Sequence, residues 1–202
     1  MAIGDGHGAP VHRARRDPEG RRRAIVEAAA ELIVEEGPGD LTHRRVAERA
    51  RVPLGATTYY FSSLEELREA ALQRLADRID EELRGIAEEL AAADGDPAVL
   101  AEALHACLAD RGQVRADAAL YFAAIRRPAL RSLALRWFDG LTEILSAHTD
   151  PDAARAVAVF SDGATVHAVL HDEPLDVAAL THTITTLMRR GTSRSRSEGR
   201  TG

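Results

Sequence analysis

The chain has no lysine, no asparagine and only one cysteine among its 202 residues. A single cysteine cannot form an intrachain disulfide, which suits a reducing compartment. No apolar run approaches the length of a membrane-spanning helix, and the first residues lack the apolar core of a secretory signal. We therefore expect a cytoplasmic protein that has no membrane partner.

Motifs that indicate catalysis are also missing. The sequence contains no glycine-rich phosphate loop, no nucleophile elbow and no His-Glu-x-x-His zinc motif. The adjacent acids Glu65-Glu66 and Glu81-Glu82 are expected on exposed helix faces, where they would not converge on one site. These absences argue against an enzyme, and we expect neither catalytic residues nor a cofactor.

The net charge of −6 is unevenly distributed along the chain. Residues 1–62 carry a net charge of +1, residues 63–190 carry −9 and residues 191–202 carry +2. Six arginines precede or begin the first expected helix: Arg13, Arg15, Arg16, Arg21, Arg22 and Arg23. Such an arm can contact DNA phosphates, because neutralising phosphates releases counterions. A disordered, solvated arm is the alternative, and the sequence leaves both open.

Capping residues, prolines and apolar periodicity divide the chain into about nine helices. These helices are expected over about residues 20–36, 42–50, 56–60, 64–90, 97–110, 115–126, 128–148, 152–171 and 176–190. Residues 111–113 are expected to form a loop, and the Ser/Arg/Gly-rich residues 191–202 a disordered tail. No strand or repeat pattern occurs, so the predicted fold class is all-α.

The most informative stretch lies between residues 42 and 67. Thr42 is a natural N-cap for a short helix, and Pro53 and Gly55 favour a turn after it. The next helix, over residues 56–60, is too short to be stable alone, so its neighbours must hold it and its outer face stays free. This pattern is typical of a helix-turn-helix, whose second helix enters the DNA major groove.

The same stretch closely resembles the DNA-binding domain of the TetR family of bacterial transcriptional regulators. The matching positions are Leu41, Thr42, Val46, Ala47, Ala50, Val52, Gly55, Tyr59, Tyr60, Phe61, Ser63, Glu65 and Leu67. Two positions depart from the family pattern. Thr58 stands where the family often has tyrosine, and Leu64 stands where it usually has a lysine that contacts phosphate. The resemblance is specific over about residues 20–75.

The resemblance implies a division of the chain into parts. A disordered basic arm (1–19) would precede a helix-turn-helix domain (20–66), and a ligand-binding and dimerisation domain (67–190) would precede the tail (191–202). The implied function is a repressor that binds a palindromic operator in double-stranded DNA and is released by a small-molecule effector. The implied homodimer forms through the last two helices, and helix 152–171 is rich in the small residues that allow close helix approach.

The resemblance also implies DNA contacts at the start of the helix from residue 42 and along the helix at 56–60. We expect Arg44 to contact DNA, with Thr42, His43 and Arg45 beside it, since helix N-termini also favour phosphate. In the recognition helix we expect base contacts from Ala56, Thr57 and Thr58, and phosphate contacts from Tyr59 and Tyr60. Phe61 is expected to pack inward.

Five of the eight aromatic residues lie between positions 121 and 160. Such a cluster suits an apolar effector cavity with a few polar groups, although plain core packing is the alternative for each residue. The candidate lining residues are His105, Cys107, Tyr121, Phe122, Arg126, Trp137, Phe138, Phe160 and His167.

His167 and His171 are four residues apart, a spacing that can bind a metal. Only Asp172 or His182 could supply a third ligand, so we expect a structural or pocket role and no metal site. Two alternatives to the repressor remain open. One is a regulator with a different trigger, such as a partner protein. The other is an all-α ligand carrier or interaction module without DNA binding, which Thr58 and Leu64 would favour.

Overall fold

The computed structural model describes the backbone of residues 17–198 and the side chains of residues 17–189. Within that range the chain is all-α, as predicted, and no strand occurs. The helices are α1 (Pro18–Glu36), α2 (His43–Arg49), α3 (Leu54–Tyr60), α4 (Leu64–Ala92), α5 (Pro97–Ala109), α6 (Arg111–Arg126), α7 (Arg131–Ser146), α8 (Pro151–His171) and α9 (Val177–Glu198). Two short 3₁₀ segments, η1 (Pro38–Asp40) and η2 (Pro128–Leu130), follow α1 and α6.

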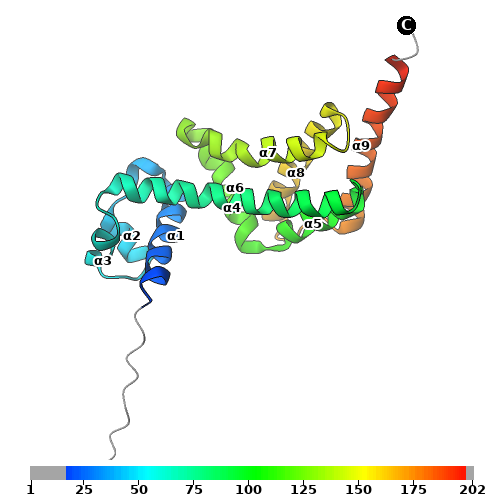
Figure 1. Ribbon diagram of the computed structural model, residues 1–202. Coiled ribbons are helices and arrows are strands. Elements are labelled where there is room, and N and C mark those ends of the chain that lie inside the picture. The colour runs from blue at the N-terminus through cyan, green and yellow to red at the C-terminus, as the bar shows by residue number, and fades with distance from the viewer. Residues whose placement is uncertain (1–16, 199–202) are drawn as a thin grey trace, which may run out of the picture.

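Helices α1, α2 and α3 form a compact unit at one end of the molecule, and α4 leads away from it (Figure 1). The first turns of α4 pack against α1, and its later turns pack against α5 and α7. Helices α5, α8 and α9 pack on one another at the other end, where α9 stands at a steep angle to α4 (Figure 1). One continuous helix therefore belongs to both ends of the molecule.

An apolar stripe along α4 is buried from Leu67 to Leu90, and Leu64 before it is partly buried. Its members recur at steps of three or four residues: Leu67, Ala71, Leu75, Ile79, Leu83, Ile86 and Leu90. Ile25 and Ile33 of α1, both fully buried, belong to the same continuous core as this stripe. Burying each such side chain contributes about 1.5–3 kcal/mol, so the stripe fixes the orientation of α4.

Side-chain caps set the helix starts. Asp17 accepts a hydrogen bond from the backbone N–H of Gly20 at 2.9 Å, so α1 begins at Pro18, two residues earlier than expected. At the start of α4, Ser63 accepts from the N–H of Glu66, whose carboxylate accepts from the N–H of Ser62. This pair of bonds is a variant of the capping box, in which the glutamate usually accepts from the N–H of the N-cap residue itself.

Two boundaries differ from the expectation. Residues 111–113 are helical rather than a loop, because the Asp110 carboxylate accepts hydrogen bonds from the N–H groups of Gly112 and Gln113 and so starts α6 directly after α5. At the other end, α9 reaches Glu198, where a tail was expected from residue 191. No proline interrupts those residues, so the helix continues. Residues 1–16 and 199–202, parts of the expected arm and tail, lie outside the described residues.

A second contact joins the two ends of the molecule beside α4. Arg127, at the start of η2, donates a hydrogen bond to the backbone carbonyl of Glu36 at the end of α1. Gly37 follows with φ = +104°, a left-handed conformation that disfavours any other residue, and the Arg127 side chain lies directly against it. Helices α1 and α6 are therefore fixed to each other, and α1 also packs against α4.

Candidate functional site

Helices α2 and α3 pack against each other in a helix-turn-helix whose inner face is apolar. Val46 and Ala47 of α2 and Phe61, which directly follows α3, are buried. Phe61 thus packs inward as expected, and the Arg22 guanidinium lies over its ring at 5.0 Å. The Thr42 hydroxyl accepts a hydrogen bond from the N–H of Arg45 and so caps α2. The outer faces of both short helices remain exposed.

The arginines of α2 differ in how firmly they are held. The Arg44 side chain is 83% exposed, and it pairs with Glu48 one turn later on the same helix. Arg45 pairs with Glu36 and donates to the backbone oxygen of Asp40, so its guanidinium is tied to the end of α1. His43 is half-buried, and its Nδ1 finds no hydrogen-bond partner within the described residues. Arg44 is consequently the arginine of this group most available to DNA.

On α3 the structure corrects one expected contact. Thr57 is fully buried, and its hydroxyl donates to the backbone oxygen of Leu54 at 2.8 Å, so it does not face outward. The reason is that a helix of seven residues needs one inward face, and position 57 lies four residues before the buried Phe61. Thr58 is exposed on the outer face beside Tyr59, which is 81% exposed.

The other expected residues of α3 are half-buried. Ala56 packs against the core, and the Tyr60 ring meets the Tyr59 ring edge-on with centroids 5.0 Å apart. Leu54 and Gly55 are exposed at the start of the helix, although the sequence did not single them out as contacts. Space around the Gly55 Cα is open, so DNA can approach the backbone closely there.

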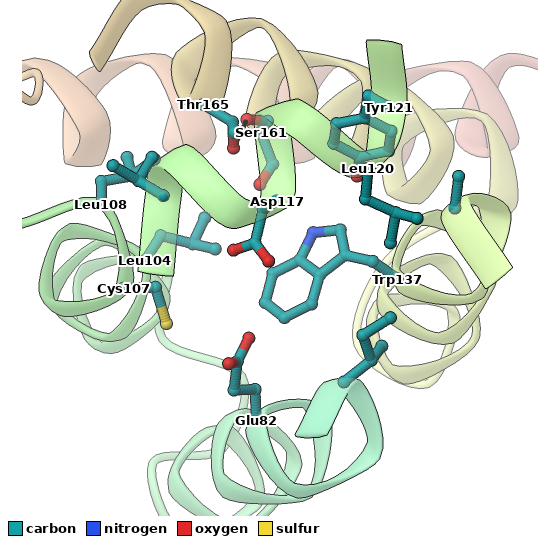
Figure 2. Close-up of a pocket in the computed structure, with 13 residues that line it drawn as sticks. Glu82, Leu104, Cys107, Leu108, Asp117, Leu120, Tyr121, Trp137, Ser161 and Thr165 are labelled. Atoms are coloured by element: carbon teal, nitrogen blue, oxygen red, sulfur yellow. Dashed lines mark hydrogen bonds between the residues drawn. The ribbon is translucent and has the colours of Figure 1, made fainter. Parts of the chain in front are cut away.

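A small cavity lies among α4, α5, α6, α7 and α8 (Figure 2). Its volume is about 30 Å³. The lining residues come from all five helices: Ile79, Glu82, Leu104, Cys107, Leu108, Val114, Asp117, Leu120, Tyr121, Ala134, Trp137, Ser161 and Thr165. A drug-sized ligand generally occupies a site of roughly 300–1,000 Å³, so the cavity must widen to admit one.

Three of the nine candidate lining residues, Cys107, Tyr121 and Trp137, line this cavity. The remaining six do not: His105, Phe122, Arg126, Phe138, Phe160 and His167. Phe122, Phe138 and Phe160 are each next in sequence to a lining residue, and one helical step turns a side chain by about 100°. Phe122 is accordingly half exposed to solvent.

The polar members of those six have other surroundings. The His105 Nδ1 lies 2.9 Å from the backbone oxygen of Leu175, so this side chain joins α5 to the segment before α9. Arg126 is exposed at the end of α6. His167 stacks on His171 with ring centroids 4.2 Å apart. Between residues 17 and 189, no group of three His, Cys, Asp or Glu side chains is placed to hold a metal ion.

Two carboxylates that the sequence analysis did not assign to the cavity point into it from facing helices. Figure 2 shows Glu82 of α4 and Asp117 of α6 directed toward each other beside the indole of Trp137. The expectation that Glu82 lies on an exposed face was therefore wrong. Position 82 follows Ile79 by three residues and precedes Ile86 by four, so it lies on the buried face of α4.

Burial makes these groups unusually easy to protonate. The pKa of Glu82 is raised to about 7 by burial and, secondarily, by the negative charge of Asp117. Burial also raises the pKa of Asp117, although Arg78 and Gln113 oppose this by stabilising its charged form. The Cys107 thiol has a pKa raised to about 11, mainly by burial, so the thiol is protonated and inert near neutral pH.

The contacts of Asp117 leave the negative charge of the cavity incompletely balanced. The Gln113 side-chain amide donates to both Asp117 oxygens, at 2.9 and 3.1 Å, and Arg78 Nη2 donates to Oδ1 at 3.3 Å. Glu82 forms no ion pair with any side chain between residues 17 and 189. Two carboxylates in a largely apolar cavity beside an indole make a site suited to a positively charged aromatic molecule.

The fold and the two sites define a class: an all-α, DNA-binding regulator with a helix-turn-helix and a separate ligand-binding domain. Residues 25–71 match the family model "Bacterial regulatory proteins, tetR family", and residues 97–190 match "Tetracyclin repressor-like, C-terminal domain". The chain belongs to the TetR family of transcriptional regulators, a conclusion that the solved relatives support independently. This membership favours a DNA-binding regulator over the ligand carrier that the sequence left open.

Solved structures of similar proteins cover most of the chain. A TetR-family member from Streptomyces coelicolor A3 is 37% identical, with a TM-score of 0.67, over 83% of this chain and 98% of that chain. The multidrug binding protein EbrR, in complex with malachite green, is 38% identical with a TM-score of 0.66 and the same coverage.

The regulator PksA of Bacillus subtilis (strain 168) is similar over a shorter stretch. It is 34% identical over 71 residues, which are 35% of each chain. The chain thus matches only about a third of PksA.

None of the helices between residues 17 and 198 combines the length and apolar character needed to cross a bilayer.

Proposed function

We propose that this regulator is a homodimeric repressor that leaves a palindromic operator when an aromatic cation enters the cavity. The observation that carries the proposal is the pair of carboxylates, Glu82 and Asp117, inside an apolar cavity beside Trp137. Buried carboxylates are costly without a partner, so a cation that supplies the partner gains more there than it would in water. A tryptophan face adds a cation–π contact.

The relatives support this choice of ligand class. EbrR has been solved with malachite green, proflavin and ethidium, which are flat or propeller-shaped aromatic dyes that carry positive charge. This chain is 38–39% identical to EbrR in those structures. We infer that an effector of the same chemical class, aromatic and cationic, suits the cavity described above.

The size of the cavity supplies the link to DNA. Because about 30 Å³ cannot hold such a cation, binding must push the lining helices apart. Ile79 and Glu82 place α4 in that lining, and the first turns of the same helix pack on α1 of the DNA-binding unit. A ligand shifts the position of α4 only as far as it binds one arrangement better than the other.

For the operator we propose Arg44, Thr58 and Tyr59 as the principal contacts, because their side chains are exposed on the outer faces of α2 and α3. Thr42, His43, Arg45, Ala56 and Tyr60 would lie beside them. Thr57 is withdrawn from this set because it is buried. The proposed DNA-binding domain comprises α1 to α3 and ends in the first turn of α4, and the proposed ligand-binding and dimerisation domain follows.

We propose that the dimer forms through α8 and α9. Val159 and Leu170, which are 58% and 75% exposed, lie with the exposed Gly163 along one face of α8. An apolar face of this kind suits an isologous interface, in which two copies present the same patch. Two recognition helices related by a two-fold axis require a palindromic operator.

We propose no catalytic role for the protein. We propose that it acts in the cytoplasm, where the chromosome lies.

The test uses tetraphenylphosphonium, an aromatic cation whose tetrahedral shape prevents intercalation into DNA. Triphenylphosphine oxide, which is neutral and carries similar rings, is the matched control. Isothermal titration should show tighter binding of the phosphonium, and quenching of Trp137, the sole tryptophan, should accompany it. Fluorescence anisotropy with a duplex selected from random DNA should show weaker DNA binding at saturating phosphonium. Equal affinity for the cation and the neutral oxide would exclude the cationic effector.

A further inference from the structure

Arg78 of α4 lies between the cavity and a second cleft. Its Nη2 reaches Asp117, which lines the cavity, at 3.3 Å. Its Nε is buried and has no hydrogen-bond partner within the described residues. The side chain is 20% exposed. The guanidinium is therefore enclosed but held by one long hydrogen bond, although it carries five donors.

The second cleft lies among α1, α4 and α6, which pack against one another around it, and has a volume of about 240 Å³. Its charged lining consists of Glu27, Glu31, Glu35, Arg74, Arg78 and Arg115. The three glutamates follow one another at four-residue spacing, so they form a row along one face of α1. Arg78 thus has carboxylates on both sides, Asp117 toward the cavity and the row of α1 across the cleft.

Two glutamates of this row, Glu31 and Glu35, tie α2 to α1. Arg49 of α2 donates to Glu31 at 3.0 Å and to both oxygens of Glu35, at 3.0 and 2.6 Å. These hydrogen bonds hold the pKa of Glu35 below its usual range, which shows that they stabilise its charged form. On the α4 side, Arg74 pairs with Glu27 at 3.1 Å. The orientation of α2 on α1 therefore depends on carboxylates that share a cleft with Arg78.

We infer that Arg78 is the counter-cation that a cationic effector displaces from Asp117, and that the displaced guanidinium moves into the cleft against the glutamates of α1. This inference rests on the function proposed above and assigns its coupling to one residue. The Arg78 guanidinium and the bound effector would repel each other if both paired with the Asp117 carboxylate. Arg78 must then pair elsewhere, and the glutamates that line its own cleft are carboxylate acceptors. At Glu31 it competes with Arg49, which loosens α2 from α1.

The inference is tested with Arg78→Met, which keeps an unbranched apolar stem, although a shorter one, and removes the charge. With its competitor gone, tetraphenylphosphonium should bind severalfold more tightly than to the wild type, while triphenylphosphine oxide binds unchanged. In the wild type, saturating phosphonium should weaken binding of the selected duplex by roughly 5- to 150-fold, as is usual for allosteric coupling. In Arg78→Met the affinity for the duplex should be nearly the same with and without saturating phosphonium, although the cation binds.

The matched control is Arg74→Met, one turn earlier on α4 and lining the same cleft. Arg74 pairs with Glu27 rather than Asp117, so its loss should leave phosphonium affinity unchanged. Thermal melts followed by circular dichroism check that each variant folds. Arg78→Lys, which keeps the charge but has fewer donors, should give intermediate coupling and supplies the test if the methionine variant does not fold.

The outcomes separate the two proposals. Phosphonium affinity that is unchanged in Arg78→Met, or coupling that persists in it, would overturn the role of Arg78 and leave the proposed function standing. A wild-type protein that does not bind the phosphonium, or whose DNA binding ignores it, would overturn both.

Discussion

The Tyr121 hydroxyl donates a 2.8 Å hydrogen bond to the Asp162 carboxylate, and this bond joins α6 to α8 beside the cavity. Burial raises the pKa of Asp162, and the hydrogen bond from Tyr121 opposes this by stabilising the charged carboxylate. The same burial raises the pKa of Tyr121, which keeps its hydroxyl protonated and able to donate. The wall of the cavity is thus held by a polar contact as well as by apolar packing.

Replacing Tyr121 by Phe should remove that donor and leave the half-buried carboxylate without it. We expect the free energy of unfolding, measured by urea denaturation, to fall by about 1–3 kcal/mol. Tyr59→Phe is the matched control, because the Tyr59 hydroxyl is on an exposed ring, and its effect should stay within about 0.5 kcal/mol. Equal stability of the two variants would show that the Tyr121–Asp162 bond contributes nothing measurable.

Cation binding should depend on pH through Glu82. Below its pKa of about 7 the carboxyl is neutral, so a bound cation must displace a proton. Affinity for tetraphenylphosphonium should therefore rise from pH 6 to pH 8, by at most about tenfold per pH unit, and then level off. Asp117, Arg78, Asp110 and Glu81 all influence this carboxyl. The Glu82→Gln variant should show a flat profile, and a wild-type slope retained in that variant would assign the titration to another group.

The same shift predicts the pH dependence of stability without a ligand. A carboxyl whose pKa is raised in the folded protein holds its proton where the unfolded chain has released it. The contribution of Glu82 to the free energy of unfolding is therefore fully present below its pKa in the unfolded chain, about 4.5. This contribution is lost as the pH rises through its folded pKa of about 7. The free energy of unfolding, measured by urea denaturation, should fall more between pH 5 and pH 8 for the wild type than for Glu82→Gln. A larger decline in the variant would contradict the assignment.

Arg44→Ala should weaken binding of the selected duplex by about 1–3 kcal/mol if Arg44 reads a base edge. In that case specificity should relax at one operator position, whereas a phosphate contact would give a nearly uniform loss across sequences. Arg84→Ala, an exposed arginine in the middle of α4, is the control for removing one charge. Fluorescence anisotropy at two salt concentrations separates the cases, and affinity equal to that of the control would remove Arg44 from the interface.

Gly163→Glu tests the proposed dimer. An added Cβ at Gly163 meets nothing within 4 Å inside the protomer, so the variant should fold normally. A glutamate there would place a charge in the interface between two copies of α8, and light scattering should report a monomer. Gly85→Glu is matched to it, since that helical glycine of α4 also has open space around its Cα. A dimer that persists in Gly163→Glu would place the interface on another surface.

The order and length of the helices are predictable from the sequence because the signals that define a helix such as α4 lie within that helix. Its apolar residues recur at helical spacing, and Ser63 with Glu66 marks its start. The helix-turn-helix is predictable for the same reason, because Thr42, Gly55 and the buried Phe61 each act on the helix or turn next to them in the sequence.

The cavity is harder to predict because its residues meet through tertiary packing. A search for aromatic residues identifies Tyr121 and Trp137 but also selects their neighbours, which point about 100° away on each helix. Glu82 and Asp117 were missed because acids are usually exposed. A usable signal existed: Glu82 keeps helical register with Ile79 and Ile86, and Asp117 with Val114 and Tyr121. Charged residues in register with an apolar stripe are thus candidates for a buried site.

If an effector tilts α4, its uninterrupted backbone would turn a small displacement at the cavity into a larger one at the DNA. Its 29 residues correspond to about 43 Å at about 1.5 Å per residue. A tilt of about 5° about one end of such a rod carries the other end through roughly 4 Å, close to the rise of about one base pair along DNA (~3.4 Å). In a dimer the two rods tilt in opposite directions, so the separation of the recognition helices changes by the sum. A few ångströms of widening around Trp137 would then be enough to move the two recognition helices out of register with the major grooves of the operator.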